Sequence, residues 1–272
     1  MRTTAGVTLI ELVVVIAITS IIAAAVALFI RRPVEAYADA ARRAALTDEA
    51  DTALRRITRD LRLALPNSVR VHAGGKFVEY IETTGGGRYR ADIANSGPPG
   101  EILDFTATDT EFDVLGTAPV LVAGNQIVVY NLYSSGTASN AYYTGATSNR
   151  TAFSSLAAPT ITIASKLFPE PSPAKRFHVV SGPVTYGCVG TQLIRYSGYS
   201  YNEPQVAPPT GGVSAVLAGN VDVGECQFVY TSGALTERIA TVSIILQINS
   251  VPAGGGLERV RMFQQAQVSN AP

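Results

Sequence analysis

The stretch Gly6-Val7-Thr8-Leu9-Ile10-Glu11-Leu12 opens an apolar run that continues to Ile30, and this run constrains how the rest of the chain can fold. Its polar or charged members are Thr8, Glu11, Thr19 and Ser20. At 1.5 Å per residue, a helix over residues 7–30 would be about 35 Å long, which is enough to cross the apolar core of a membrane. The run therefore predicts a helix that extends beyond any globular domain.

Glu11 distinguishes this run from an ordinary membrane anchor, because a carboxylate in a hydrocarbon layer costs about 2.5–3.5 kcal/mol. A plain anchor leaves Glu11 unexplained. A secretory signal peptide is a second alternative, since Ala25-Val26-Ala27 resembles the small-residue pattern at which such peptides are cut. The apolar region of a signal peptide is normally only about 7–15 residues long, however, and a carboxylate inside it is unusual. We therefore expect Glu11 to have a charged partner.

The residues around Glu11 resemble the class III signal of type IV pilins and of type II secretion pseudopilins. A short polar leader with Arg2 ends at Gly6, and an apolar residue, the sequence T-L-I-E-L and a long apolar run follow. Val7 stands where the family usually has Phe, although other apolar residues are tolerated there. The resemblance implies that a prepilin peptidase cuts between Gly6 and Val7 and methylates the new amine of Val7. It also implies that Glu11 neutralises the N-terminal amine of a neighbouring subunit.

Elementary electrostatics agrees with this role of Glu11. A carboxylate or an ammonium group alone is unstable in an apolar helix bundle, whereas a close pair offsets part of both desolvation costs and defines the register between subunits. The positive-inside rule favours the opposite orientation, because Arg31 and Arg32 follow the run and only Arg2 precedes it. We nevertheless expect the N-terminus in the cytoplasm, since the large C-terminal part must be exported.

Helical character continues beyond the apolar run. Pro33 removes one backbone donor and predicts a kink, and residues 35–65 are rich in helix formers. An apolar stripe at helical spacing runs along this segment: Leu46, Ala50, Ala53, Leu54, Ile57, Leu61, Ala64 and Leu65. Asp39 with Arg43 and Asp51 with Arg55 are expected to pair on the exposed side. One helix from Val7 to Leu65, ended by Pro66, would be about 90 Å long and would back a globular head with its second half.

Short β runs separated by Gly- and Pro-rich connections follow residue 66. They cover residues 76–83, 101–107, 126–133, 160–165, 176–181, 183–189, 192–197, 225–231, 240–250 and 259–268. No later helical pattern supplies crossovers, so we expect one or two antiparallel sheets on the amphipathic helix. The predicted fold class is α+β and type IV pilin-like. Its parts are a leader at residues 1–6, a membrane or filament-core helix at 7–32, an amphipathic helix at 33–66 and a β-rich head at 67–272.

Cys188 and Cys226 are the two cysteines of the chain, and their spacing does not fit a metal site. Because export places the head in an oxidising compartment, we expect a disulfide that joins two sheet elements; two reduced core cysteines are the alternative. The bridge would close a loop of about 38 residues, which the loop-entropy model values at about 3–4 kcal/mol.

The charge balance argues against a nucleic-acid partner, and the lack of recognisable catalytic motifs argues against enzymatic chemistry. Lys and Arg together number 21, as do Asp and Glu, so the formal net charge is +0. A cluster of arginines alternates with acids and is expected on a solvated helix face: Arg55, Arg56, Arg59 and Arg62. No Walker A loop, G-x-S-x-G, H-E-x-x-H or paired C-x-x-C motif occurs. We predict no catalytic residue, no cofactor and no nucleic-acid partner.

Other residues have both a structural and a functional interpretation. His72 and His178 lie in no recognisable catalytic motif, and the triplets Gly85–Gly87 and Gly254–Gly256 are expected in flexible turns. Four acids could provide oxygen ligands for Ca²⁺, although exposed acids without a metal are the preferred interpretation: Asp104, Asp109, Glu111 and Asp113. Five tyrosines could form an adhesive surface, but we favour cross-strand packing: Tyr142, Tyr143, Tyr196, Tyr199 and Tyr201.

Segments of the head resemble MshO-type minor pilins of mannose-sensitive haemagglutinin (MSHA) pilus systems; they cover residues 103–105, 111–116, 127–132 and 179–186. This resemblance implies a low-abundance subunit that initiates assembly or caps the filament. The implied partners are other major and minor pilins through the N-terminal helix, the prepilin peptidase and the inner-membrane assembly platform. The implied location is the inner membrane as a single-pass protein, and then the pilus at the cell surface. A type II secretion pseudopilin, or a tip adhesin or DNA-uptake module on the same anchor, is the alternative.

Overall fold

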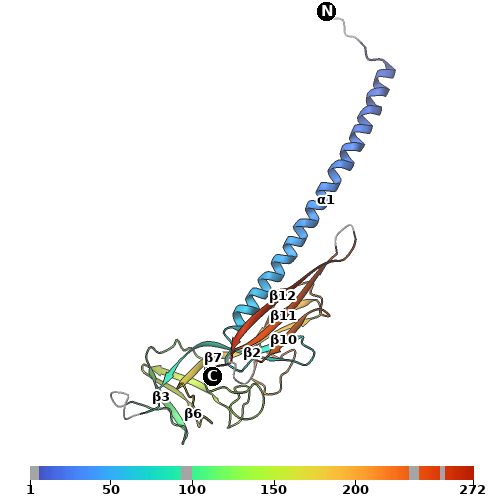
Figure 1. Cartoon of the computed structure of the whole chain (residues 1–272). Helices are drawn as coiled ribbons and strands as arrows, with labels where there is room; N and C mark the ends of the chain where they lie inside the picture. Colours follow the sequence, from blue (N-terminus) through green and yellow to red (C-terminus); the bar gives the residue numbers. More distant parts are fainter. Residues whose placement is uncertain (1–5, 93–99, 233–238, 252–254) are drawn as a thin grey trace, which may run out of the picture.

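The computed structural model describes residues 6–92, 100–232, 239–251 and 255–272. One helix, α1 (Leu9–Leu61, 53 residues), projects from a β-rich head, and its N-terminal half stands free of that head (Figure 1). Thr8 caps the start of the helix, and Arg62 follows its last residue. The predicted end at Leu65 is too late, because the Leu65 amide donates to the carbonyl of Ile81 at 2.8 Å and thereby joins the sheet.

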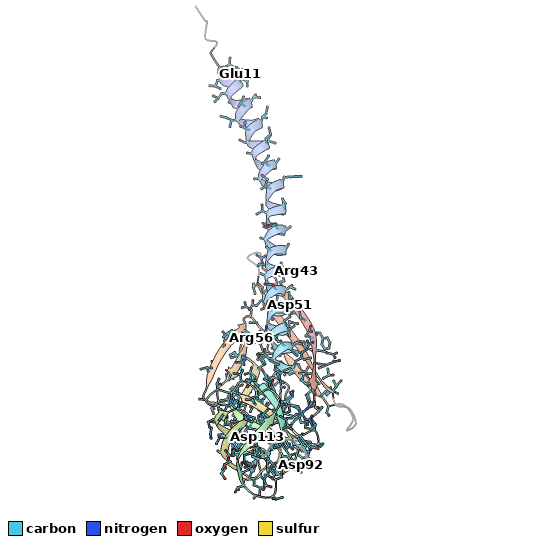
Figure 2. The ribbon with its side chains drawn as sticks, turned by 90° about the vertical axis from the view of Figure 1, so that its left-hand side faces the viewer. Glu11, Arg43, Asp51, Arg56, Asp92 and Asp113 are labelled. Atoms are coloured by element: carbon cyan, nitrogen blue, oxygen red, sulfur yellow. A yellow bond between two sulfur atoms is a disulfide. The ribbon has the colours of Figure 1, made fainter. Side chains whose placement is uncertain are left out.

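Pro33 lies inside α1 and does not interrupt it. In Figure 2 the N-terminal half of the helix leans away from the axis of the half that packs on the head. A proline in a helix removes the hydrogen bond to the carbonyl four residues earlier, which promotes bending of this kind. That Pro33 is the point of a kink stays a prediction.

Antiparallel sheets form the head, so the predicted α+β class is confirmed. The large sheet contains β1 (Arg70–Val71), β2 (Phe77–Tyr89), β3 (Asp109–Leu115), β4 (Gln126–Val129), β5 (Arg150–Ala157), β6 (Thr160–Lys166), β7 (Arg176–Val189), β8 (Gln192–Ser197) and β9 (Val213–Ala218). The small sheet contains β10 (Gln227–Thr231), β11 (Ile239–Ser250) and β12 (Glu258–Ser269), in that order.

The large sheet closes on itself at the end of the head farthest from the free half of α1 (Figure 1). Strands β2, β3, β6, β5, β4 and β7 are hydrogen-bonded in this order, and β7 pairs again with β2. This ring encloses an apolar core that includes Tyr89, Phe112, Ile127, Phe177 and Val179. We call this part of the head, formed by β3–β6 with the end of β2 and the start of β7, the distal lobe.

The rest of the head, which we call the proximal lobe, packs against the second half of α1. The predicted apolar stripe is confirmed, since Ala50, Ile57 and Leu61 are fully buried in one core with the small sheet. Alternate residues of β11 complete this core, as expected for a sheet with one covered face: Ala240, Val242, Ile244, Leu246 and Ile248. Burial of each large aliphatic side chain contributes about 1.5–3 kcal/mol.

The predicted disulfide between Cys188 and Cys226 is present. Cys188 lies near the end of β7 in the large sheet, and Cys226 directly precedes β10 in the small sheet. The bridge therefore joins the two sheets, as expected. Lys76 reinforces the same connection, because its Nζ donates to the Cys226 carbonyl at 2.7 Å while its own carbonyl accepts from the Cys188 amide at 3.0 Å.

The prediction of a flexible turn at Gly85–Gly87 is wrong. These residues lie within β2 and pair with residues 177–179 of β7. A Cβ atom on Gly87 would lie 3.0 Å from the ring of Phe177, and one on Gly86 would lie 2.7 Å from the Phe177 carbonyl oxygen. Close packing across the strand pair therefore excludes side chains here, and no chain reversal is involved. Of the second triplet, residue 254 lies outside the described residues.

The prediction of a strand over residues 101–107 is also wrong, and the next strand begins only at Asp109. Asp104 instead accepts hydrogen bonds from the amide and the hydroxyl of Thr106, both at 2.7 Å, which favours a local turn over a ladder. The runs at 176–181 and 183–189 form one continuous strand, β7. Strands β1, β3, β5 and β9 do not correspond to any run predicted from the sequence.

Candidate functional site

The start of α1 is closed by a capping box between Thr8 and Glu11. The Glu11 amide donates to the Thr8 hydroxyl oxygen at 3.3 Å, and the Thr8 amide donates to the Glu11 carboxylate at 3.4 Å. A carboxylate in the first turn is also favoured by the helix dipole. The T-x-x-E sequence therefore fixes the first residue of the helix at Leu9, two residues after Val7 of the bond predicted to be cleaved.

The hydroxyl groups in the apolar half of α1 bond to their own helix. Thr19 Oγ1 donates to the carbonyl of Val15 at 2.8 Å, and Ser20 Oγ donates to that of Ile16 at 2.7 Å. Such bonds satisfy a hydroxyl without water, as an apolar environment requires. Glu11 differs, because the hydrogen bonds of its carboxylate are two long contacts to Thr8, at 3.4 and 3.5 Å.

The apolar half of α1 is exposed around its whole circumference. Leu9 is 82% exposed and Phe29 is 84% exposed, and an 18-residue window of the helix has a mean hydropathy of 3.0 with none of it buried. By length and composition the helix can cross a membrane. An apolar surface of this size needs lipid or other helices around it.

The residues predicted for processing lie just before the helix. Val7 is 71% exposed, and a Cβ atom placed on Gly6 would have no described atom within 4 Å. The bond between them is therefore accessible in the free chain. Residues 1–5 of the predicted leader lie outside the described residues, and cleavage, methylation and the role of Glu11 in assembly stay predictions.

A polar cluster that the sequence did not reveal attaches the lower end of α1 to the large sheet. Asp60, 9% exposed, accepts a hydrogen bond from the Tyr186 hydroxyl at 2.5 Å and lies 3.6 Å from Nε of Arg195. Arg195 also lies 3.4 Å from the carboxylate of Glu82. Burial, together with the Asp60 carboxylate, raises the pKa of Tyr186, so its hydroxyl remains a donor. These residues are far apart in sequence, and no local pattern connects them.

One of the two ion pairs predicted along α1 is confirmed. Arg55 Nε lies 2.6 Å from the Asp51 carboxylate. The pairing of Asp39 with Arg43 is wrong, because Asp39 contacts Arg42. Arg43 instead lies 2.8 Å from Glu258 of β12 and ties the helix to the small sheet. The arginine cluster is exposed, as expected: Arg55, Arg56, Arg59 and Arg62.

The four acids considered for Ca²⁺ do not form a metal site in the described residues. The carboxylate of Asp109 accepts the amide of Asp104 at 2.8 Å. Asp113 accepts the Thr160 hydroxyl at 2.7 Å and lies 3.4 Å from Arg90 Nε. Glu111 is exposed, and no group of three or more His, Cys, Asp or Glu gathers in the described part of the chain.

Most of the five tyrosines pack inside the head, which agrees with the packing interpretation favoured from the sequence. Tyr142 is fully buried with the guanidinium of Arg70 at 3.6 Å from its ring centre, and Arg150 covers Tyr201 in the same way at 3.7 Å. Tyr199 is 8% exposed. Tyr143 and Tyr196 are partly exposed.

His178 gives the head a testable pH dependence. Burial, assisted by the charge of Arg176, lowers the pKa of His178 from 6.5 to about 4. His178 therefore binds a proton more tightly in the unfolded chain than in the folded one. Its contribution to the stability of the fold is complete above about pH 6.5 and is lost as the pH falls to about 4. We expect the free energy of unfolding to fall by about 2 kcal/mol between pH 7 and pH 5 on this account.

Denaturant unfolding of the full chain in non-ionic micelles measures this change. His178→Gln should remove most of the decrease between these two pH values, because glutamine does not titrate. An equal decrease in the variant would assign the pH dependence to other groups.

Comparison with known protein families identifies the N-terminal segment. Residues 1–27 match the family described as the prokaryotic N-terminal methylation motif. No curated protein and no solved structure gives a significant match to the chain. The matched segment includes the Gly6–Val7 bond, the capping box and most of the exposed apolar half of α1. This match, with a long apolar helix packed on antiparallel sheets, supports a type IV prepilin-like protein.

Proposed function

We propose that the chain is a minor type IV pilin-like subunit that helps to initiate or cap an MSHA-type pilus. The observation that carries the proposal is the methylation motif at residues 1–27, which coincides with a helix that is apolar and exposed on all sides. Such a helix is suited to move from a bilayer into a bundle of similar helices. A structural role, and not catalysis, accounts for these features.

The proposed route begins in the inner membrane, with the N-terminus in the cytoplasm and the head in the periplasm. The prepilin peptidase removes residues 1–6 and methylates Val7. The assembly platform then transfers the subunit into the filament, where its helix contacts those of other pilins. Glu11 lies four residues from the new amine along the chain and pairs with the amine of a neighbouring subunit.

Mass spectrometry of the mature chain tests the processing step. We expect the N-terminal peptide to begin with N-methyl-Val7, because Gly6–Val7 is exposed and lies within the methylation motif. Gly6→Val should block the cut and leave residues 1–6 attached. A mature chain that begins at Leu28 would instead assign the apolar run to an ordinary signal peptide.

Deletion of the gene tests the assembly role. We expect surface pili to be lost or strongly reduced, and expression of the chain from a plasmid should restore them. Normal piliation together with a defect in protein secretion would assign the chain to a secretion pseudopilus. Normal piliation and normal secretion would refute an assembly role in either system.

A further inference from the structure

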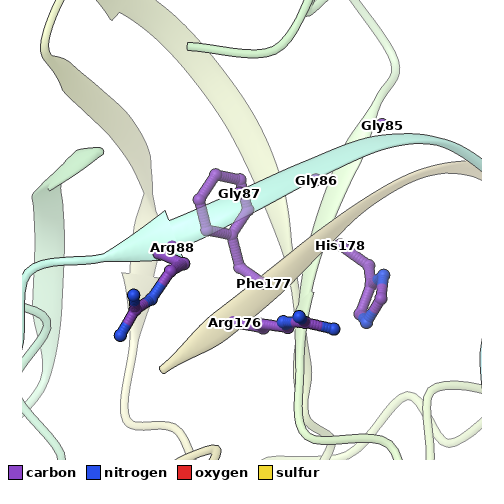
Figure 3. A pocket seen from close by; sticks show the side chains of 7 residues that line it. All are labelled: Gly85, Gly86, Gly87, Arg88, Arg176, Phe177 and His178. Atoms are coloured by element: carbon purple, nitrogen blue, oxygen red, sulfur yellow. The ribbon is translucent and has the colours of Figure 1, made fainter. Parts of the chain in front are cut away.

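A hollow of about 400 Å³ lies on the β2–β7 pair in the distal lobe (Figure 3). Two segments line it, residues 85–88 of β2 and residues 176–178 of β7. Figure 2 places Asp92, which follows β2 in the chain, and Asp113 of β3, which pairs with the end of β2, at the end of the head opposite Glu11. The hollow therefore belongs to the part of the molecule farthest from the membrane helix.

The register of the strand pair determines which side chains share this surface. Arg88 lies directly opposite Arg176, and Gly86 lies directly opposite His178. Residues opposite one another in an antiparallel pair point to the same face. Phe177 points to the other face, into the core of the distal lobe. The hollow is thus an outer surface on which the backbone positions of two arginines lie opposite one another, with His178 two residues farther along β7.

The charges of the two arginines at this surface are not balanced by acids of the described residues. Arg88 and Arg176 are both exposed, and no ion pair joins either of them to an acid among the described residues. Arg90, which directly follows β2, differs, because the carboxylate of Asp113 lies 3.4 Å from its Nε. Like charges directly opposite one another destabilise a strand pair, so the bare arginine pair costs stability in the free head.

His178 adds a polar group that is also unsatisfied. Its Nε2 atom is buried and has no hydrogen-bond partner within the described part of the chain. Figure 3 shows the guanidinium of Arg176 extending on the same side of β7 as this ring, while Arg88 points toward the other end of the hollow. A guanidinium presents a planar fork of donors that matches carboxylate and phosphate oxygens.

We propose that this hollow binds an oxyanion, the carboxylate or phosphate group of a ligand, between Arg88 and Arg176. The bound anion would relieve the repulsion between the two arginines and accept hydrogen bonds from them. Gly86 adds no side chain to this surface, because a Cβ atom there would lie 2.7 Å from the Phe177 carbonyl oxygen.

The two histidines of the chain allow a direct test by NMR. The full chain, labelled at histidine and held in non-ionic micelles, is titrated with inorganic phosphate or with glucuronate at constant ionic strength. We expect the ring signals of His178 to shift with a dissociation constant of about 1 mM, and those of His72 to stay unchanged. A response to phosphate alone or to glucuronate alone would identify which of the two sources the site prefers.

Arginine-to-alanine variants distinguish specific binding in the hollow from weak binding elsewhere on the surface. Arg88→Ala and Arg176→Ala should each weaken binding by about tenfold or more, because each removes a charge-assisted hydrogen bond. Arg62→Ala, which removes an exposed arginine from α1, is the matched control and should leave the shift unchanged. Equal shifts with chloride, or equal affinity in all three variants, would overturn the proposal.

Thermal unfolding provides a second measurement that does not depend on the histidine signals. At low salt and without added anion, Arg88→Ala should raise the unfolding temperature of the head, because it removes the like-charge pair. Phosphate should raise the unfolding temperature of the native chain more than that of the variant. A variant less stable than the native chain at low salt, with the same response to phosphate, would contradict the proposed site.

Discussion

A chain with Glu11→Val should insert in the membrane and fold its head, but it should be lost from the filament fraction. Valine in place of a carboxylate removes a cost of about 2.5–3.5 kcal/mol for burial in hydrocarbon, so insertion does not suffer. The effect arises at assembly, where the methylated amine of a neighbouring subunit would be left without a counter-charge. Loss of one partner of a buried pair costs about 3–5 kcal/mol, which corresponds to at least about a hundredfold loss of incorporation.

The measurement is the amount of chain in sheared filaments relative to the membrane fraction. Glu11→Gln is an informative companion, because glutamine can keep the capping box with Thr8 while it removes the charge. Thr19→Val is the matched control in the same apolar half, since the Thr19 hydroxyl bonds only to its own helix. Unchanged incorporation of the Glu11→Gln variant would show that capping, and not charge, explains Glu11.

Removal of the disulfide should have the largest effect on the stability of the head itself. Cys188 and Cys226 are 38 residues apart in sequence, and a loop of this size is worth about 4 kcal/mol on the loop-entropy model. Both residues are also buried, at 3% and 1% exposure, in the core shared by α1 and the two sheets. We therefore expect Cys188→Ala with Cys226→Ala to lower the free energy of unfolding by about 4 kcal/mol.

Urea unfolding with and without reductant tests this expectation. The native chain in reductant should match the double variant, because both lack the cross-link. Lys76→Met is a useful second variant, since it removes only the hydrogen bonds of Nζ to the carbonyls of Gly224 and Cys226. A loss of less than about 1 kcal/mol in the double variant would mean that non-covalent contacts alone hold the two sheets together.

The parts of the structure that could be predicted from the sequence are those in which apolar residues repeat at a regular spacing or a short motif marks the end of an element. The stripe from Leu46 to Leu61 repeats at helical spacing, and β11 alternates between buried and partly exposed residues, so both were recognisable. The capping residues Thr8 and Glu11 mark the start of α1 by a local rule. In each case the deciding interaction lies within a few residues of chain or along one regular face.

The parts that could not be predicted depend on partners far away in sequence. The glycine triplet at 85–87 reads locally as a turn, and only the pairing with β7 makes it a strand. Strand β5 is rich in Ser and Ala, and its strand conformation depends on pairing with β4 and β6. The sequence around Asp60 and around Arg195 contains no pattern that predicts their contact. Arg88 and Arg176 lie opposite one another only because of the register between β2 and β7.

The β2–β7 pair also has a mechanical consequence. These two strands share eleven paired positions and run from the proximal lobe to the hollow at the distal end. A ligand held at Arg88 would pull on the far end of β2, while the helix pulls on the segment at 63–65, which is hydrogen-bonded to the same strand. The tension then follows the axis of β2, and because the hydrogen bonds that join residues 63–65 to this strand are perpendicular to that axis, they are loaded in shear.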